Sequence, residues 1–440
     1  MVGSTASSPW FRQPPKPIGD GLCYECIAFS LYSGGGFREN YSDPNWWVLY
    51  EGLPEYFDFL NSVEGRDLPA TGRPPLYPLA LSWVYSVFGR GPEAFMAIRI
   101  FSAICLALAG GLATGLTRCL LLQKTQSKWI GSLGSLATLA FAASQRTMQD
   151  YTTDFLTEPL ALLLTQMAIV VFVSVAILGD KNQDQYKTDG AVQPGLGWAI
   201  GSGVIVGLMI LARSLFVTWL PGLLLLHFLS TRGNPWQRAR GASVVAITVL
   251  VICLPWWIHN CVALSRFMPL GTQGPVAMAG GYCEEAFEDG GNWSHVPELR
   301  IRRELAERDD FRAATQIEGE LMVVEQAKTE VREWMAKHWT QLPTLAWRRA
   351  VSHWNPYSGR ALLWKFAIVV GLIWTVINLG QARWWLIGLP VLSTLVTMLL
   401  YETGGRFLVP LYGLLFTLSG LGIFAIAMLV GRLGKLADTR

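Results

Sequence analysis

Residues 156–178 read LTEPLALLLTQMAIVVFVSVAIL, an apolar run in which Glu158 is the single charged side chain. A helix rises about 1.5 Å per residue, so a run of this length can cross a hydrocarbon core of about 30 Å. The whole chain has the same character, because 51% of its 440 residues are hydrophobic and only 15% are charged. That composition does not suit a soluble surface. The sequence therefore predicts an all-α polytopic membrane protein.

Similar apolar runs predict about nine membrane spans. They lie at 94–117, 129–144, 156–178, 196–212, 215–230, 241–258, 361–379, 384–401 and 407–430. Basic residues follow the first, fifth and ninth runs, namely Arg118, Lys124, Lys128, Arg232, Arg238, Arg240, Arg432, Lys435 and Arg440. Because Lys and Arg favour the cytoplasmic side, the three clusters share one side only if residues 1–93 lie outside. The C-terminus then lies inside.

This topology divides the chain into four expected parts. Residues 1–93 form a first external loop with interfacial helices, among them the short apolar stretch 76–88. Residues 94–258 form a six-span bundle, residues 259–360 an external helical loop, and residues 361–440 a three-span C-terminal segment. The first and third parts together make up the external material.

Charge and cysteine content exclude several classes of ligand. The net charge of +3 is small, and no basic patch with interleaved aromatics appears, so we expect no nucleic-acid partner. Cys23 and Cys26 form one Cys-x-x-Cys pair, without a second pair or nearby histidines to complete a zinc site. We expect no cofactor. A divalent metal between Asp20 and Glu158 stays open as an alternative, although a third clear ligand is missing.

Polar and charged side chains gather at the external ends of the predicted spans, where placing them is costly. They are Asp20, Arg73, Asp150, Asp154, Glu158, Arg213, His259, Asn260, Glu402 and Arg406. Such a set suits a site in which arginines hold a lipid phosphate while a carboxylate acts on a polar substrate.

Each of these residues also has a simpler interpretation. Asp20 and Glu158 each precede or open a helical stretch and would then be helix caps. His259 would be a plain interfacial residue. Arginines at span ends also anchor proteins at the headgroup level, which would account for Arg73, Arg213 and Arg406.

Six segments carry a resemblance to a known family. They are GDGLCYECIAFSLYSGGGF (19–37), TGRPPLYPLALSWVYSVFG (71–89), LTEPLALLL (156–164), LARS (211–214), PWWIHN (255–260) and GGRFLVP (404–410). In this order they resemble the C-superfamily (GT-C) glycosyltransferases that use lipid-linked sugars. The similarity is greatest to the protein O-mannosyltransferase-like bacterial enzymes and the aminoarabinose transferase of lipid A. It covers residues 20–430 and implies a GT-C-like bundle.

The resemblance implies roles for particular residues. Asp20 matches the catalytic acid of the first external loop and Glu158 the carboxylate of the second, so both are expected to be catalytic residues. The expected ligands of the donor phosphate and sugar are Tyr24, Arg73, Arg213, His259, Asn260, Glu402 and Arg406. The sequence departs from the family in having Gly21 where Glu is usual and His259 where Arg is usual. Relatives also begin with a span that is missing here, so we expect a truncated start.

The resemblance also implies an activity. We expect a hexosyltransferase-type enzyme, mannosyltransferase-like, that moves a sugar from a polyprenyl-phosphate donor to a hydroxyl of a protein, lipid or glycan, with inversion. The expected location is the bacterial inner membrane, with the site facing the periplasm. The alternatives are a polymerase or ligase that transfers whole glycans, a transporter or flippase, and an inactive relative.

Overall fold

The structure is a computed structural model that describes residues 10–16, 19–50, 65–124, 128–185, 196–354 and 362–437. Each of the nine predicted spans coincides with a helix, which confirms the predicted helical membrane architecture. These helices are α5 (Pro92–Leu122), α6 (Lys128–Ser144), α8 (Glu158–Gln185), α9 (Leu196–Ala212), η4 (Ser214–Trp219) with α10 (Leu220–Ser230), α11 (Pro235–Ala263), α18 (Leu362–Asn378), α19 (Arg383–Leu399), and η7 (Val409–Leu411) with α20 (Tyr412–Ala437). Arg440 and the side chains of Lys128, Arg432 and Lys435 lie outside the described residues.

Four segments are long and apolar enough to cross a membrane, at Pro92–Leu122, Glu158–Ile177, Pro235–Ala263 and Val409–Gly431. The other predicted spans fall on apolar helices of 10–17 residues. A helix of 17 residues is about 25 Å long, slightly less than the average hydrocarbon core. A bilayer adapts to such short helices by thinning locally, at a modest energetic cost.

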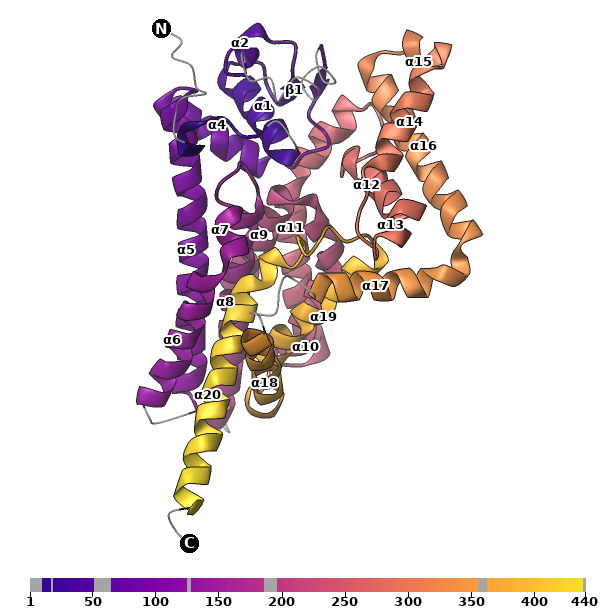
Figure 1. Ribbon diagram of the computed structural model, residues 1–440. Coiled ribbons are helices and arrows are strands. Elements are labelled where there is room, and N and C mark those ends of the chain that lie inside the picture. Colours follow the sequence, from indigo (N-terminus) through magenta and orange to yellow (C-terminus); the bar gives the residue numbers. More distant parts are fainter. Residues whose placement is uncertain are drawn as a thin grey trace.

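The described residues of 1–93 fold into short elements at one end of the bundle (Figure 1). We expect them to be external and keep the name first external loop for them. These elements are η2 (Trp10–Arg12), α1 (Asp20–Tyr32), β1 (Arg38–Asn40), α2 (Pro44–Trp47), β2 (Asp67–Pro69) and α4 (Leu76–Phe88). Strands β1 and β2 pair antiparallel, with Glu39 opposite Leu68. Helix α4 has the bounds expected for the apolar stretch 76–88, and the short helix α7 (Arg146–Asp150) precedes α8.

The described residues of the second segment that we expect to be external, 259–360, form a helical lobe beside the first (Figure 1). It contains α12 (Gln273–Gly281), α13 (Glu284–Glu288), α14 (Val296–Ala306), α15 (Asp309–Ala313), α16 (Gln316–Lys337), η5 (Trp339–Gln341) and α17 (Leu342–Trp354). Ile301, Val323 and Leu345 belong to its own buried core. Helix α17 runs crosswise to the long helices and leads the chain back to the bundle.

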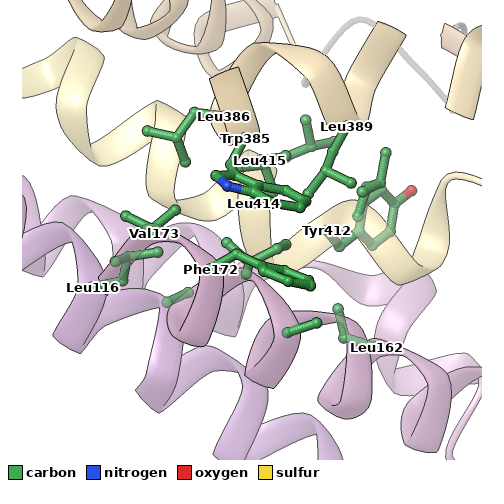
Figure 2. Packing of buried hydrophobic residues seen from close by; sticks show 14 of the residues in the cluster. Leu116, Leu162, Phe172, Val173, Trp385, Leu386, Leu389, Tyr412, Leu414 and Leu415 are labelled. Carbon is green, nitrogen blue, oxygen red and sulfur yellow. The ribbon is translucent and has the colours of Figure 1, made fainter. Parts of the chain in front are cut away.

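Aromatic stacking joins the first six membrane helices to the C-terminal membrane segment. Phe172 of α8 and Trp385 of α19 stack with ring centroids 4.0 Å apart and planes 7° from parallel, among buried leucines (Figure 2). The Trp385 Nε1 donates a hydrogen bond of 2.7 Å to Ser230 Oγ, so its single polar atom is satisfied inside the core.

A buried carboxylate fastens the first external loop. Glu25 of α1 is fully buried and accepts hydrogen bonds from Arg90 Nε at 2.7 Å and Trp46 Nε1 at 2.6 Å. Tyr85 of α4 donates to the same carboxylate at 3.1 Å. A buried charge needs such a set of donors, because unpaired it would cost several kcal/mol. Helix α1 is thereby tied to α2 and α4, which fixes the position of Asp20 at its start.

Glycines allow α18 and α20 to approach closely. A methyl group added at Gly371 would overlap the Leu418 carbonyl oxygen, and one added at Gly422 would overlap that of Ala367. Small residues at such crossings let helix backbones meet in a membrane, where there is little hydrophobic drive for association.

Substitution of Gly422 by valine tests this contact. We expect Gly422→Val to lower the free energy of unfolding in mixed micelles by about 1–3 kcal/mol, the usual cost of overpacking. Gly115→Val is the matched control, because Gly115 also lies in an apolar helix but has open space around it. The control corrects for the difference in helix propensity between glycine and valine. Equal losses in the two variants would contradict the close crossing of α18 and α20.

Candidate active site

Asp20 is the first residue of α1 and binds an arginine with each oxygen. Its Oδ1 lies 2.7 Å from Arg73 Nη1, and its Oδ2 accepts a hydrogen bond of 2.8 Å from Arg406 Nη2. Arg73 belongs to the turn that precedes α4, and Arg406 to the turn between α19 and η7. The N-cap position belongs to Gly19, and no side-chain cap is present there. The simpler interpretation of Asp20 as a helix cap is therefore wrong.

Glu158 opens α8 and is fully buried. Its Oε1 lies 2.8 Å from Arg213 Nη1 and also accepts a hydrogen bond from Arg406 Nε. Its other oxygen, Oε2, is buried without a hydrogen-bond partner among the described residues. Arg406 therefore links the two carboxylates that were expected to be functional. We call Asp20, Arg73, Glu158, Arg213 and Arg406 the ion-pair cluster.

The composition of the ion-pair cluster leaves it with a surplus of positive charge. Three guanidinium groups face two carboxylates, so the five ionised side chains carry a net charge of +1. These contacts also show that the three arginines are not headgroup anchors that reach freely into water. A partly buried site with one uncompensated arginine is suited to an anion.

The electrostatic environment keeps Asp20 ionised. Burial alone would raise the pKa of its carboxyl, but Arg73 and Arg406 outweigh burial and hold that pKa below its usual range. The same pairing keeps the pKa of Arg73 and of Arg406 above the usual value, although burial opposes it. Tyr24 lies beside them, with Arg73 5.8 Å from the centre of its ring. Burial raises the pKa of Tyr24 to about 12, so it is a neutral phenol.

Gln273 is a neighbour of Arg73 that the sequence did not indicate. With its amide oriented to satisfy both ends, its oxygen accepts from Arg73 Nη1 at 2.6 Å and its nitrogen donates to Gly72 O at 2.6 Å. The preceding loop is held by Asn260, whose Nδ2 donates to Pro269 O at 2.8 Å. Among the described residues, Asn260 makes no hydrogen bond with the ion-pair cluster, and its predicted contact with the donor stays a prediction.

Glu402 lies in a separate buried network that shapes the turn carrying Arg406. Its carboxylate contacts His353 Nδ1 at 2.8 Å and accepts from the backbone N–H of Thr403 and of Gly405, both at 2.8 Å. Gly405 has a φ of 82°, a conformation that favours glycine. Glu402 therefore orients the Arg406 backbone, and its predicted contact with the donor stays a prediction. His353, on the distant helix α17, was not indicated by the sequence.

His259 also lies apart from the ion-pair cluster. Its ring stacks on Trp256 at 5.2 Å and meets Phe37 edge-on at 5.7 Å. With Phe37, Arg38 and Pro69 it lines a mostly apolar cavity of about 540 Å³ between the end of α11 and the first external loop. Its predicted role in binding the donor phosphate stays a prediction.

Comparison with known proteins gives a structural likeness only. No protein-family model and no curated protein matches the sequence. Two solved structures of ArnT from Cupriavidus metallidurans are similar to this chain. The one bound to undecaprenyl phosphate has a TM-score of 0.40 and 16% identity, and covers 95% of this chain and 75% of its own. The one in the apo state has a TM-score of 0.38 and 16% identity, and covers 94% and 75%.

The pairing of Asp20 makes a prediction about stability and pH. A carboxyl whose pKa is lowered by folding stabilises the protein above its ordinary pKa of 3.8, and loses this contribution as the pH falls through the lowered value. We expect the wild type to exceed Asp20→Asn in melting temperature by a constant amount from about pH 7 to about pH 5. Below about pH 4 the gap should close progressively. A gap that does not change between neutral and strongly acidic pH would contradict the ionised pairing of Asp20.

Proposed function

We propose that this protein is a membrane glycosyltransferase that moves a sugar from a polyprenyl-phosphate donor to an acceptor hydroxyl. The observation that carries the proposal is the ion-pair cluster, in which Asp20 is held between two arginines at the end of an apolar helical bundle. The cluster combines a carboxylate with a surplus guanidinium charge. The apolar helices around it suit a lipid donor whose tail lies in the bilayer.

The donor phosphate would bind to Arg73 and Arg406. Arginine presents several N–H donors in a planar fork that matches phosphate oxygens, and charge-assisted bonds of this kind are stronger than neutral ones. Arg213 completes the positive surface from its place beside Glu158. Glu158 would act as a positioning residue, because it holds the two arginines that converge on its Oε1.

The chemical step follows from these positions. The acceptor oxygen forms a bond with the anomeric carbon of the sugar while its proton passes to the Asp20 carboxylate. The bond between the anomeric carbon and the phosphate oxygen breaks, and its electron pair leaves with the phosphate. The arginines would stabilise the charge that grows on that leaving group. Attack from the side opposite the phosphate inverts the anomeric centre.

The low pKa of Asp20 in the resting structure makes it a weak base, and the donor would correct this. A bound phosphate competes for the guanidinium groups of Arg73 and Arg406 and adds negative charge beside the carboxylate. Both effects raise the pKa of Asp20 toward the range in which a carboxylate accepts a proton effectively. The donor would thus activate the base that acts on it.

The finer features of the proposal concern substrate and place. We propose a hexose-type donor, mannose being the first to test, and a hydroxyl acceptor on a protein, lipid or glycan. We place the protein in a bacterial inner membrane with Asp20 facing the periplasm, because the basic clusters follow spans that end on the other side. No cofactor enters the step as proposed.

Three alternatives to the proposed function make different predictions about the same site. A transporter or flippase is expected to carry ionisable residues near mid-bilayer, whereas Asp20 and Glu158 lie at the starts of their helices. A polymerase or ligase of lipid-linked glycans would share the phosphate site, and differs in requiring a long glycan on the donor. An inactive relative would bind the lipid without transfer.

A transfer assay on the purified protein in lipid tests the proposal. With radiolabelled polyprenyl-phosphate hexoses, we expect the wild type to release polyprenyl phosphate and Asp20→Asn to lose at least about a hundredfold in rate, the usual contribution of a general base. Asp310→Asn is the matched control, since Asp310 is an exposed carboxylate paired with Arg308 in the outer lobe.

The outcomes separate the functions. Equal rates in the wild type and Asp20→Asn would remove Asp20 from the mechanism. Release from long-glycan donors alone would assign a polymerase or ligase. Binding of the donor without release, across several sugars, would overturn the proposed enzymatic function.

A further inference from the structure

Another cavity, with several polar residues in its lining, lies at the end of the bundle opposite the ion-pair cluster. It has a volume of about 230 Å³ and lies between α8, α9, the end of α10 and the start of α11. Its polar lining comprises Ser202, His227, Thr231, Gln237 and Arg240. The space exceeds the roughly 30 Å³ that one water molecule occupies in the liquid.

Two polar side chains of this cavity, His227 and Thr231, lack hydrogen-bond partners in the described part of the chain. The His227 side chain is more than nine-tenths buried, and its ring makes no hydrogen bond with any residue that the structure describes. Its Nε2 faces Gly241, where an added methyl group would approach to 3.1 Å. The Thr231 hydroxyl is also buried without a partner in the described part of the chain. Buried polar groups are normally satisfied, so these two indicate a missing ligand.

The residues that line the cavity indicate which charge the missing ligand carries. Arg240 is exposed at the mouth of the cavity and forms no ion pair with any described residue. No carboxylate is among the lining residues of the cavity in the part of the chain described. Arg240, Thr231 and Ser202 donate hydrogen bonds, and His227 donates from one ring nitrogen in its neutral form. A set of donors with one fixed positive charge fits an anion with several acceptor oxygens.

The apolar residues of the lining indicate that the anion is the headgroup of a lipid. Val175, Leu196 and Val244 line the same cavity, and Trp198 lines it while remaining partly exposed. Tryptophan is enriched at the level of lipid headgroups. A phosphate at Arg240 with its glycerol and acyl chains along these apolar residues would satisfy both parts of the lining.

We propose that this cavity binds the phosphate of an anionic phospholipid in the leaflet opposite the ion-pair cluster. We call it the opposite-leaflet site. It is independent of the proposed transfer reaction, since none of its lining residues belongs to the ion-pair cluster. A bound lipid there would brace α9, α10 and α11, the helices that carry Arg213 and its neighbours at their far ends.

Native mass spectrometry of the full chain tests the proposal with three probes. They are dioleoyl phosphatidylglycerol, dioleoylglycerol, which has the same chains without phosphate, and inorganic phosphate. We expect the wild type to retain one molecule of the phospholipid and not of dioleoylglycerol. Arg240→Gln and His227→Leu should weaken retention, Arg240→Gln by about tenfold, because a charge-assisted bond to phosphate is lost. Arg118→Gln is the matched control, an exposed arginine on α5 outside the cavity.

Each outcome decides the proposal. Retention of inorganic phosphate instead of the lipid, lost in Arg240→Gln, would keep the phosphate chemistry and assign a soluble source. Equal retention of both lipids, or retention in Arg240→Gln that equals retention in Arg118→Gln, would overturn the site. Because Arg240 lies on the surface, its variant is informative even if His227→Leu fails to fold.

Discussion

The contact on which the site depends is the sharing of Arg406 between two carboxylates. Its guanidinium binds Asp20, which lies 386 positions earlier, and Glu158, which lies 248 positions earlier. Desolvating such groups is costly, and removing one partner of a buried pair typically costs about 3–5 kcal/mol. These ion pairs therefore fix the positions of three segments relative to one another, namely the first external loop, the start of α8 and the turn before α20. Each carboxylate also has an arginine of its own, so the cluster is an alternating chain of charges.

Hydrogen bonds of residues outside the ion-pair cluster hold the members of the cluster in place. Glu25 fixes α1 through Arg90, and Glu402 fixes the turn of Arg406 through His353. Gln273 holds Arg73 from the outer lobe. Positioning from three separate elements reduces the entropy that would be lost when arginines close on a phosphate. Burying the carboxylates of Glu25 and Glu402 costs free energy, and both residues set the geometry of the ion-pair cluster.

Hydrophobic run length was enough to predict the helices, because burial in lipid imposes a simple pattern on sequence. The five members of the ion-pair cluster could also be predicted, since each is a charge placed at the outer end of an apolar segment. The pattern could not separate them from Glu402 and His259, which occupy similar positions in sequence but contact His353 and Trp256 in the fold. The roles of His353 and Gln273 could not be predicted, because the residues that they contact are distant from them in sequence. Only tertiary packing decides which charges meet.

We propose that a donor phosphate draws Arg73 and Arg406 away from Asp20 and so makes Asp20 a base. Difference infrared spectroscopy of the wild type against Asp20→Asn isolates the Asp20 carboxylate band, which can be titrated with and without farnesyl phosphate. We expect a lowered pKa of Asp20 in the free protein and a higher pKa when the phosphate is bound. An Asp20 pKa that stays the same or falls on binding would contradict it, because the arginines would then still be paired with the carboxylate.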